Sequence, residues 1–417
     1  MNRLVKSPKK LFPWGSNDCL GSVDDTAMGF HLRVTPVLFL RLDKAGNRIL
    51  ARPSVPTEGL NGTPRVIPFS TQTAPDRVKK GGNMANVHFV GSVALDSPEE
   101  VFAAIGQHCG PYLKRVPDGE PGGRRLWISF QIPVLRANPC LTPVGQTIVP
   151  LKVAEGARAE DIHFGELGYA REARPSYEDF LAARSAGRIA ARVRFQVSLP
   201  TPWAVVMPFV QQPDAWQVYP AYERGMLREV ERILKAIPHH DLAIQWDVCL
   251  EMLAWDGRWQ TSPPFPGMEQ VFVANFSRLA AAVPGDVELG FHLCYGDLDA
   301  RHFVQPIDAT KLVEMANLIT RSVQRPIHWM HMPVPIDRTD DAYFAPLQGL
   351  ELQPVTELYL GLVHAEDGVD GTARRIAAAK KFVSKFGVAS ECGISRGRDA
   401  NLAMNFIKTY AGAAAIA

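Results

Sequence analysis

Short apolar segments alternate with amphipathic segments along most of this chain, and this alternation constrains the fold more than any other feature. From about residue 86 the pattern predicts strands near 87–95, 125–134, 193–200, 241–248, 286–293, 326–332, 356–363 and 386–391. Between them it predicts helices near 98–108, 175–187, 216–236, 268–283, 309–323, 370–385 and 398–412. A chain organised in this way builds a largely parallel sheet covered by helices.

Eight predicted strands separated by helices indicate a parallel eight-stranded α/β barrel, the (β/α)8 or TIM-barrel fold, over residues 86–417. A doubly wound sheet is the alternative that the pattern leaves open. Residues 1–85 read differently. They predict a hairpin, with strands at 30–40 and 48–52, followed by an irregular arm rich in Pro, Gly, Thr and Asn. We therefore expect an N-terminal extension over residues 1–85 ahead of the barrel domain.

The composition argues against several other classes of protein. Of the 417 residues, 46% are hydrophobic and 21% are charged, which is typical of a globular protein with a substantial core. The 45 basic and 43 acidic residues nearly cancel, so nucleic acid is not an expected partner. No apolar run is long enough to predict a membrane span, and the basic start lacks the apolar core of a signal peptide. Six cysteines without CxxC spacing predict free thiols and a reducing, cytoplasmic location.

Three potential metal ligands stand at predicted strand ends. His292 and Cys294 end the strand 286–293, and Cys392 ends the strand 386–391. In a barrel the carboxyl ends of the strands meet at one rim, where functional groups gather. Imidazole nitrogen and thiolate sulfur are ligands that zinc prefers, and catalytic zinc sites keep one position open. These residues therefore predict a zinc site, and with it a metalloenzyme.

Further polar and aromatic side chains fall at the same predicted rim. Segment 115–125 carries Asp118 and Glu120 between glycines, prolines and arginines, which predicts a loop at the barrel mouth that binds a polar part of a substrate. Tryptophans at strand ends either line the mouth, which would suit a bulky or aromatic substrate, or pack in the core. The other residues at predicted strand ends are Trp203, Trp246, Asp247, Cys249, Glu251, His328, Trp329, His331, His364, Glu366 and Asp367.

Four segments of the barrel domain carry a family resemblance. They are Phe89-Val90-Gly91-Ser92, Ile244-Gln245-Trp246-Asp247, His292-Leu293-Cys294-Tyr295 and Glu391-Cys392-Gly393-Ile394-Ser395-Arg396. In the same order they resemble the Gly-Ser-Phe-Pro, Gln-Ile-Asp-Glu, His-Met-Cys-Tyr and Asp-Cys-Gly-Leu-Lys-Thr-Arg segments of the catalytic C-terminal barrel of cobalamin-independent methionine synthase. The wider superfamily includes uroporphyrinogen decarboxylase and the zinc-dependent coenzyme M alkyltransferases.

The resemblance implies that His292, Cys294 and Cys392 bind zinc, which holds a substrate thiol as a thiolate for attack on a carbon, commonly a methyl. It also implies that Asp247 contacts the amino group of the thiol substrate. The family's fourth ligand is a Glu on the next strand, and this chain has no carboxylate there. His331 is the expected replacement. His328, Glu251 and Glu366 are the other candidates for that position.

We therefore expect a zinc-dependent methyl or alkyl transferase that acts on a small molecule together with a thiol or other methyl-acceptor co-substrate. The expected catalytic residues are Asp247 and His331, and the expected substrate contacts are Ser92, Asp118, Glu120, Trp246, Trp329 and Glu366. The chain lacks a second barrel and a match to the folate-binding segments, so a bulky donor such as a methoxy-aromatic is favoured over methyl-folate. Two alternatives remain: a metal-free decarboxylase or lyase whose arginines hold substrate carboxylates, and a barrel that binds a small molecule or delivers a corrinoid-type methyl carrier. The oligomeric state is left open.

Overall fold

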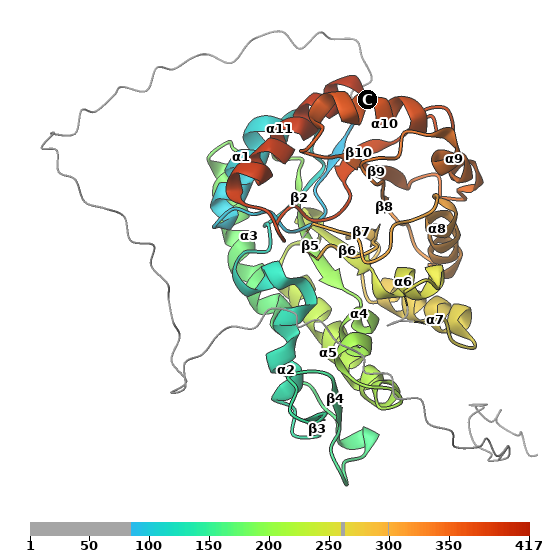
Figure 1. Cartoon of the computed structure of the whole chain (residues 1–417). Coiled ribbons are helices and arrows are strands. Elements are labelled where there is room, and N and C mark those ends of the chain that lie inside the picture. The colour runs from blue at the N-terminus through green and yellow to red at the C-terminus, as the bar shows by residue number, and fades with distance from the viewer. Residues whose placement is uncertain (1–84, 260–262, 299) are drawn as a thin grey trace, which may run out of the picture. The chain divides into compact units, whose positions relative to one another are not determined.

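Eight parallel strands form one sheet that curls into a nearly closed barrel, which confirms the predicted (β/α)8 fold (Figure 1). The computed structural model describes residues 85–259, 263–298 and 300–417. The barrel strands are β1 (Val87–His88), β2 (Arg115–Pro117), β5 (Arg194–Pro200), β6 (Leu242–Val248), β7 (Glu288–Leu293), β8 (Trp329–Pro333), β9 (Glu357–Val363) and β10 (Gly387–Ser390). They pair in the order β1-β10-β9-β8-β7-β6-β5-β2. Isolated parallel bridges from Val87 to Leu113 and from Ser92 to Gly119 link the two ends of this order.

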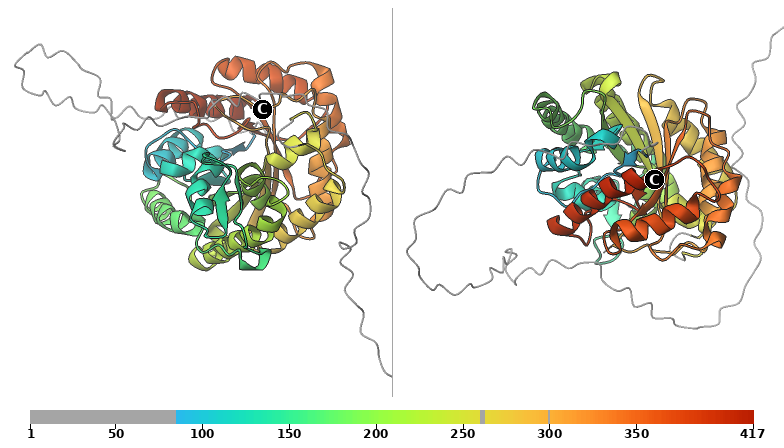
Figure 2. Two further views of the ribbon diagram at one scale, coloured as in Figure 1. Left: turned by 60° about the horizontal axis from the view of Figure 1, so that its bottom comes forward. Right: turned by 90° about the horizontal axis from the view of Figure 1, so that it is seen from above.

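Helices surround the barrel, as the turned views show (Figure 2). Their sequences explain their positions: the Ser97 side chain accepts a hydrogen bond from the Glu100 N–H and so caps the first helix. The helices are α1 (Pro98–Cys109), α2 (Ile132–Arg136), α3 (Tyr169–Ser185), α4 (Pro202–Phe209), α5 (Ala215–Ala236), α6 (Leu250–Asp256), α7 (Met268–Ala281), α8 (Thr310–Ser322), α9 (Asp341–Phe344), α10 (Gly368–Ala379) and α11 (Ala400–Ile416). In the long helix α5, the apolar residues that recur at helical spacing are buried, and the helix packs against α3 and α4.

Side chains along each strand alternate between the barrel interior and the helix layer. On β6, Gln245 points inward, where its amide contacts His88 and Trp329. Trp246, the next residue, therefore faces the helices. On β7, Gly290 leaves the space that the Trp329 indole fills, because a Cβ at position 290 would lie 2.0 Å from that ring. The interior below the rim is thus densely packed.

The predicted strand at 125–134 is wrong. The second barrel strand is β2, which lies within the segment that we expected to be a loop, and Gly122–Gln131 instead form the 3-10 helix η2. The apolar residues of 125–134 alternate as in a strand, but Leu126 is 57% exposed and Trp127 has a φ of +50°. Because β2 is only three residues long, its apolar run is too short to stand out in the sequence.

Between β2 and α3 the chain leaves the barrel and forms α2 and an antiparallel pair, β3 (Leu141–Pro143) with β4 (Leu151–Val153). This excursion projects away from the barrel (Figure 1). The predicted extension over residues 1–85 lies, except for Ala85, outside the described residues. None of the described helices has the length and apolar character needed to cross a membrane.

Candidate metal centre

Three predicted ligands meet at the carboxyl end of the barrel. The sulfur of Cys392 lies 3.6 Å from the sulfur of Cys294 and 3.6 Å from Nε2 of His292. With Zn–S bonds of about 2.3 Å and Zn–N bonds of about 2.0–2.1 Å, a tetrahedral site spaces two sulfurs roughly 3.8 Å apart and a sulfur and a nitrogen roughly 3.6 Å apart. Both separations from Cys392 are close to these values, and the ligand atoms of the three buried side chains all lie within 4.8 Å of one another. Within the described ranges they are the one group of three such side chains that could hold a metal ion.

The strand register and a tight turn bring the ligands together. His292 on β7 stands level with Asp247 on β6 and with His331 on β8. Beyond β7 the chain turns at Gly296, whose φ of +87° is a conformation that favours glycine. The N–H of Gly296 donates a hydrogen bond to the sulfur of Cys294 at 3.2 Å. Cys392 comes to the same point from the end of β10.

The surroundings of the two sulfurs suit a bound cation. Arg396 donates a hydrogen bond from Nη2 to the sulfur of Cys392 at 3.5 Å. The neighbouring Cys249 thiol and burial raise the pKa of Cys294, and the nearby Cys294 sulfur and burial raise the pKa of Cys392, so the neutral thiols are favoured without a metal. A divalent cation reverses this effect, since it stabilises both thiolates at once. The donor set therefore fits zinc, with the sulfurs as thiolates.

His331 lies next to this group but offers it no free nitrogen. Its Nδ1 is 2.7 Å from Nδ1 of His292, and its Nε2 donates a hydrogen bond to the carbonyl oxygen of Ser390 at 2.9 Å. Burial lowers the pKa of His331 to about 3, so the ring is neutral. The expectation that His331 replaces the family's Glu as a ligand does not match this arrangement, because both of its ring nitrogens are already used.

The other candidates for a fourth ligand also lie elsewhere. His328 precedes β8, and its Nδ1 accepts a hydrogen bond from the Leu289 N–H near the start of β7. Glu251 is on α6 and accepts a hydrogen bond from the Thr201 hydroxyl at 2.6 Å. Glu366 is exposed beyond β9. In the described structure the group of His292, Cys294 and Cys392 thus stands without a fourth side-chain ligand.

Two carboxyl groups face the barrel interior beside the metal ligands. Burial raises the pKa of Asp247 to about 7, while hydrogen bonds from Gln245 (2.9 Å) and from the indole N–H of Trp127 (3.2 Å) fix its two oxygens. Burial and the charge of Asp247 raise the pKa of Glu120 to about 8. Near neutral pH the pair therefore holds at least one proton that a cationic group could displace.

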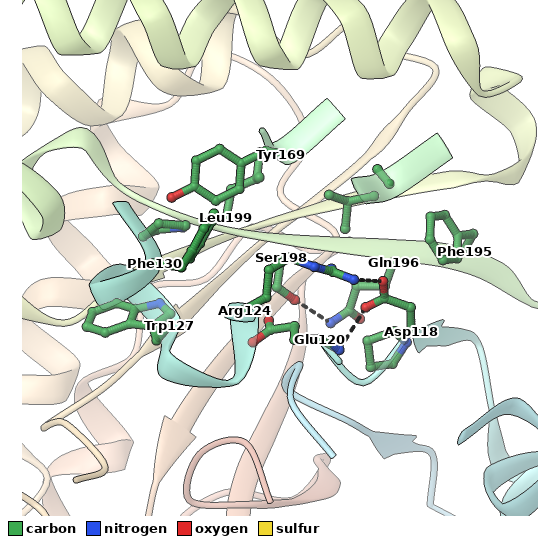
Figure 3. Close-up of a pocket in the computed structure, with 14 residues that line it drawn as sticks. Asp118, Glu120, Arg124, Trp127, Phe130, Tyr169, Phe195, Gln196, Ser198 and Leu199 are labelled. Carbon is green, nitrogen blue, oxygen red and sulfur yellow. Dashed lines mark hydrogen bonds and ion pairs between the residues drawn. The ribbon is translucent and has the colours of Figure 1, made fainter. Parts of the chain in front are cut away.

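Glu120 lines a narrow cavity with Trp127, Ser198 and the aromatic rings of Phe130 and Tyr169 (Figure 3). The backbone that positions Glu120 and Trp127 is strained, because both residues have a positive φ, of +52° and +50°. We refer to this space as the Glu120 cavity. Non-glycine residues held in such a conformation are concentrated at binding sites.

Asp118 and Ser92 are placed by the structure at the same rim. Asp118 forms an ion pair with Arg124 at 2.6 Å and accepts a hydrogen bond from the Glu120 N–H at 2.9 Å. Burial opposes its charge, but Arg124 and the hydrogen bonds from Ser176 and the Glu120 N–H together keep the pKa of Asp118 below its usual value. Asp118 therefore shapes the loop that carries Glu120. Ser92 is buried against Gly393, where a Cβ would lie 2.2 Å from its hydroxyl oxygen, so it supports the turn after Cys392.

The structure does not place Trp246 and Trp329 at the barrel mouth. Both side chains are completely buried. Trp246 faces the helix layer, and Trp329 lies inside the barrel one layer below His331, with its indole under the guanidinium of Arg115. The alternation of side chains on β6 and the inward packing of β8 account for these positions.

A second cavity, of about 400 Å³, adjoins the metal ligands on the side of Cys392. We call it the Glu391 cavity, because Glu391 lies between two histidines on its wall: 3.5 Å from Nε2 of His302 and 3.7 Å from Nδ1 of His364. Burial and the charge of Asp297 raise the pKa of Glu391 well above its usual range. Burial lowers the pKa of His364 to about 3. Glu366 lines the same cavity.

Three residues of the site escaped the sequence analysis. Trp127 fell within the wrongly predicted strand. His302 lies in an irregular segment without periodicity, and both of its ring nitrogens are buried without a hydrogen bond. Arg396 was part of the family resemblance, and its position four residues after Cys392 was the available signal for a contact with that sulfur.

Comparisons with known proteins agree with this architecture. No protein-family model matches the chain, and no curated protein matches its sequence. Among solved structures, a B12-independent methionine synthase from a Shewanella species in complex with selenomethionine matches with a TM-score of 0.52 and 12% identity, covering 79% of this chain and 96% of that one. A protein described as a candidate vitamin-B12-independent methionine synthase from Listeria monocytogenes matches with a TM-score of 0.46 and 15% identity, covering 76% and 86%. The chain thus shares the fold of the Shewanella B12-independent methionine synthase structure.

Proposed function

We propose that this protein is a zinc-dependent enzyme that transfers a methyl or other alkyl group to a thiol substrate. The observation that carries the proposal is the convergence of His292, Cys294 and Cys392 at the carboxyl rim of the barrel, where the Cys392 sulfur lies 3.6 Å from a ligand atom of each of the other two. The Shewanella structure with the same fold holds selenomethionine, which is the selenium counterpart of a methylated thiol product. Zinc bound by these residues would supply a thiolate at neutral pH, because metal coordination deprotonates a substrate thiol.

The protein's own groups would then hold the charge and the orientation of the reacting sulfur. Arg396 and the Gly296 N–H withdraw electron density from the two cysteine sulfurs through hydrogen bonds. Glu120 and Asp247 are placed to bind an ammonium group, because binding one would let both carboxyls ionise. A thiol that carries an amino group is therefore the favoured acceptor.

The Glu391 cavity is the proposed place of the alkyl donor. As the donor's carbon forms a bond to sulfur, its bond to the leaving oxygen or nitrogen breaks, and the leaving atom needs a proton. We assign that proton to Glu391, because burial and the charge of Asp297 raise the pKa of its carboxyl well above the usual range and so favour the protonated form. The cavity of about 400 Å³ has room for a donor larger than a simple methyl compound, such as a methoxy-aromatic.

The metal-free decarboxylase alternative has less support. It needs arginines that are free to bind substrate carboxylates. Of the arginines nearest the Glu120 cavity, Arg124 is paired with Asp118, and Arg396 contacts the backbone oxygen of Asp297 at 2.7 Å and the sulfur of Cys392. Both cations therefore already serve the structure of the site.

The test combines a metal assay with a product assay. Freshly purified protein should contain about one zinc per chain, as one tetrahedral site requires. The cobalt-substituted protein should change its sulfur-to-metal absorption when homocysteine is added, and change less with 3-mercaptopropionate, which lacks the amino group. Incubation with homocysteine and carbon-13-labelled methoxy-aromatic or methyl-folate donors should yield the labelled thioether by mass spectrometry. Absence of bound zinc, or the absence of any thioether together with no spectral response to thiols, would refute the proposal.

A further inference from the structure

A chain of hydrogen bonds leads from the backbone to the candidate zinc ligand His292. The carbonyl oxygen of Ser390 on β10 is 2.9 Å from Nε2 of His331, and Nδ1 of His331 is 2.7 Å from Nδ1 of His292. All three residues are buried, with the two histidines at most 1% exposed. Water therefore does not compete for these contacts, and the polar atoms must satisfy one another.

The direction of each hydrogen bond follows from the chemistry of the partners. A carbonyl oxygen accepts only, so Nε2 of His331 must carry a proton. In a neutral imidazole the other nitrogen is then bare, and Nδ1 of His331 must accept. The proton between the two rings therefore belongs to Nδ1 of His292. Its Nε2 is left with a free lone pair, and that atom is the one 3.6 Å from the sulfur of Cys392.

We infer that His331 is a positioning residue that fixes the tautomer and ring orientation of His292, and that it is not itself the fourth zinc ligand. The inference rests on the proposed zinc site. It gives a physical reason for a histidine at the position where the related family has a ligating Glu. A group that accepts a hydrogen bond from the non-ligating nitrogen of a zinc-bound histidine orients the ring and makes it a better ligand.

The arrangement also changes the charge of the centre. Two cysteine thiolates balance the charge of one zinc ion, and neutral His292 adds none. A fourth, carboxylate ligand would have added one negative charge. Without it, one coordination position stays available to substrate, and the centre attracts an anionic sulfur ligand more strongly. The proposed zinc centre therefore has three protein ligands and one coordination position for the substrate.

The first test is nitrogen-15 NMR of histidine-labelled protein, read before and after zinc addition. In the metal-free protein His292 should carry its proton on Nδ1 and His331 on Nε2, which long-range proton–nitrogen correlations report directly. The His292→Gln and His331→Gln variants assign the signals. On zinc addition only the Nε2 signal of His292 should move to a metal-bound position. A proton on Nε2 of His292 in the metal-free protein, or a metal-bound nitrogen in His331, would overturn the inference.

The second test compares two variants that a ligand role would affect alike. His331→Gln keeps an amide that both accepts from His292 and donates to Ser390, whereas His331→Leu keeps only the bulk. We expect His331→Leu to weaken zinc binding by about 10–100-fold and His331→Gln to restore part of that loss. X-ray absorption should show two sulfurs and one histidine nitrogen in the wild type and in both variants. Equal losses in the two variants, with one nitrogen fewer than in the wild type, would refute the positioning role while leaving the zinc enzyme intact. A wild type that binds no zinc would refute the proposed function, and the metal-free NMR spectrum would still decide the tautomers.

Discussion

Replacing Cys392 by serine tests the metal centre most directly. The sulfur of Cys392 is the atom that joins the cluster, since it lies 3.6 Å from both the sulfur of Cys294 and the imidazole of His292. A serine hydroxyl stays protonated at neutral pH and cannot replace a thiolate ligand. Loss of a group that only supports a ligand costs about 10–100-fold in affinity, so loss of the ligand itself should exceed about 100-fold.

This loss has a predictable effect on stability. When free zinc is 100 times the wild-type Kd, binding stabilises the wild-type fold by about 2.7 kcal/mol. In Cys392→Ser, with Kd raised at least about 100-fold, zinc should contribute no more than about 0.4 kcal/mol. The zinc-dependent rise in Tm should therefore fall from roughly 5 °C to below about 1 °C. Thermal unfolding with and without zinc, together with elemental analysis of the purified protein, measures both effects.

The matched control is the same substitution at Cys109, a fully buried thiol on α1 that donates a hydrogen bond to the Ile407 carbonyl. Cys109→Ser should destabilise the metal-free protein and leave both the zinc content and the zinc-dependent rise in Tm unchanged. If Cys392→Ser retains one zinc per chain with the same shift, Cys392 is not a ligand. If Cys109→Ser loses zinc as well, the effect reflects folding and the reasoning fails.

Three further perturbations test the interior of the barrel. Burial and the charge of Asp247 raise the pKa of Glu120 to about 8, whereas the ordinary value for Glu is about 4.3. Between these two pH values the unfolded chain has released a proton that the folded chain still holds. The free energy of unfolding therefore falls as the pH rises through this range. In urea unfolding, the free energy of unfolding of Glu120→Gln minus that of the wild type should therefore increase from pH 5 to pH 8, by up to about 1.4 kcal/mol per pH unit. The same difference at pH 5 and at pH 8 would contradict this. Trp127→Phe removes the indole N–H that lowers the pKa of Asp247, so carbon-13 NMR titration should show that pKa raised further, and an unchanged titration would dismiss the contact. Gly290→Ala places a Cβ 2.0 Å from a buried indole ring and should cost about 1–3 kcal/mol or more, whereas Gly285→Ala, which has open space, should stay within about 0.5 kcal/mol.

The candidate site shows where local sequence was sufficient and where it was not. His292, Cys294 and Cys392 could be selected because they end apolar strands, and parallel strands of one barrel must end at the same rim. The role of His331 could not be predicted, because the spacing that puts it beside His292 also suits a ligand. Its hydrogen bond to Ser390, 59 positions away, decides between the two. Trp127 and His302 could not be found, since irregular segments carry no periodicity that reports direction.

The sequence by itself determined the barrel and its rim, because apolar periodicity and strand length are local properties that every barrel strand except β2 displays. It also determined that two sulfurs and an imidazole would be available at that rim. Only the tertiary structure decided which nitrogen of which histidine faces the sulfurs and which carboxyl groups share the barrel interior. It also decided that Trp246 and Trp329 lie away from the barrel mouth. These outcomes depend on register between strands and on hydrogen bonds between residues far apart in the chain, and no local pattern encodes such distances.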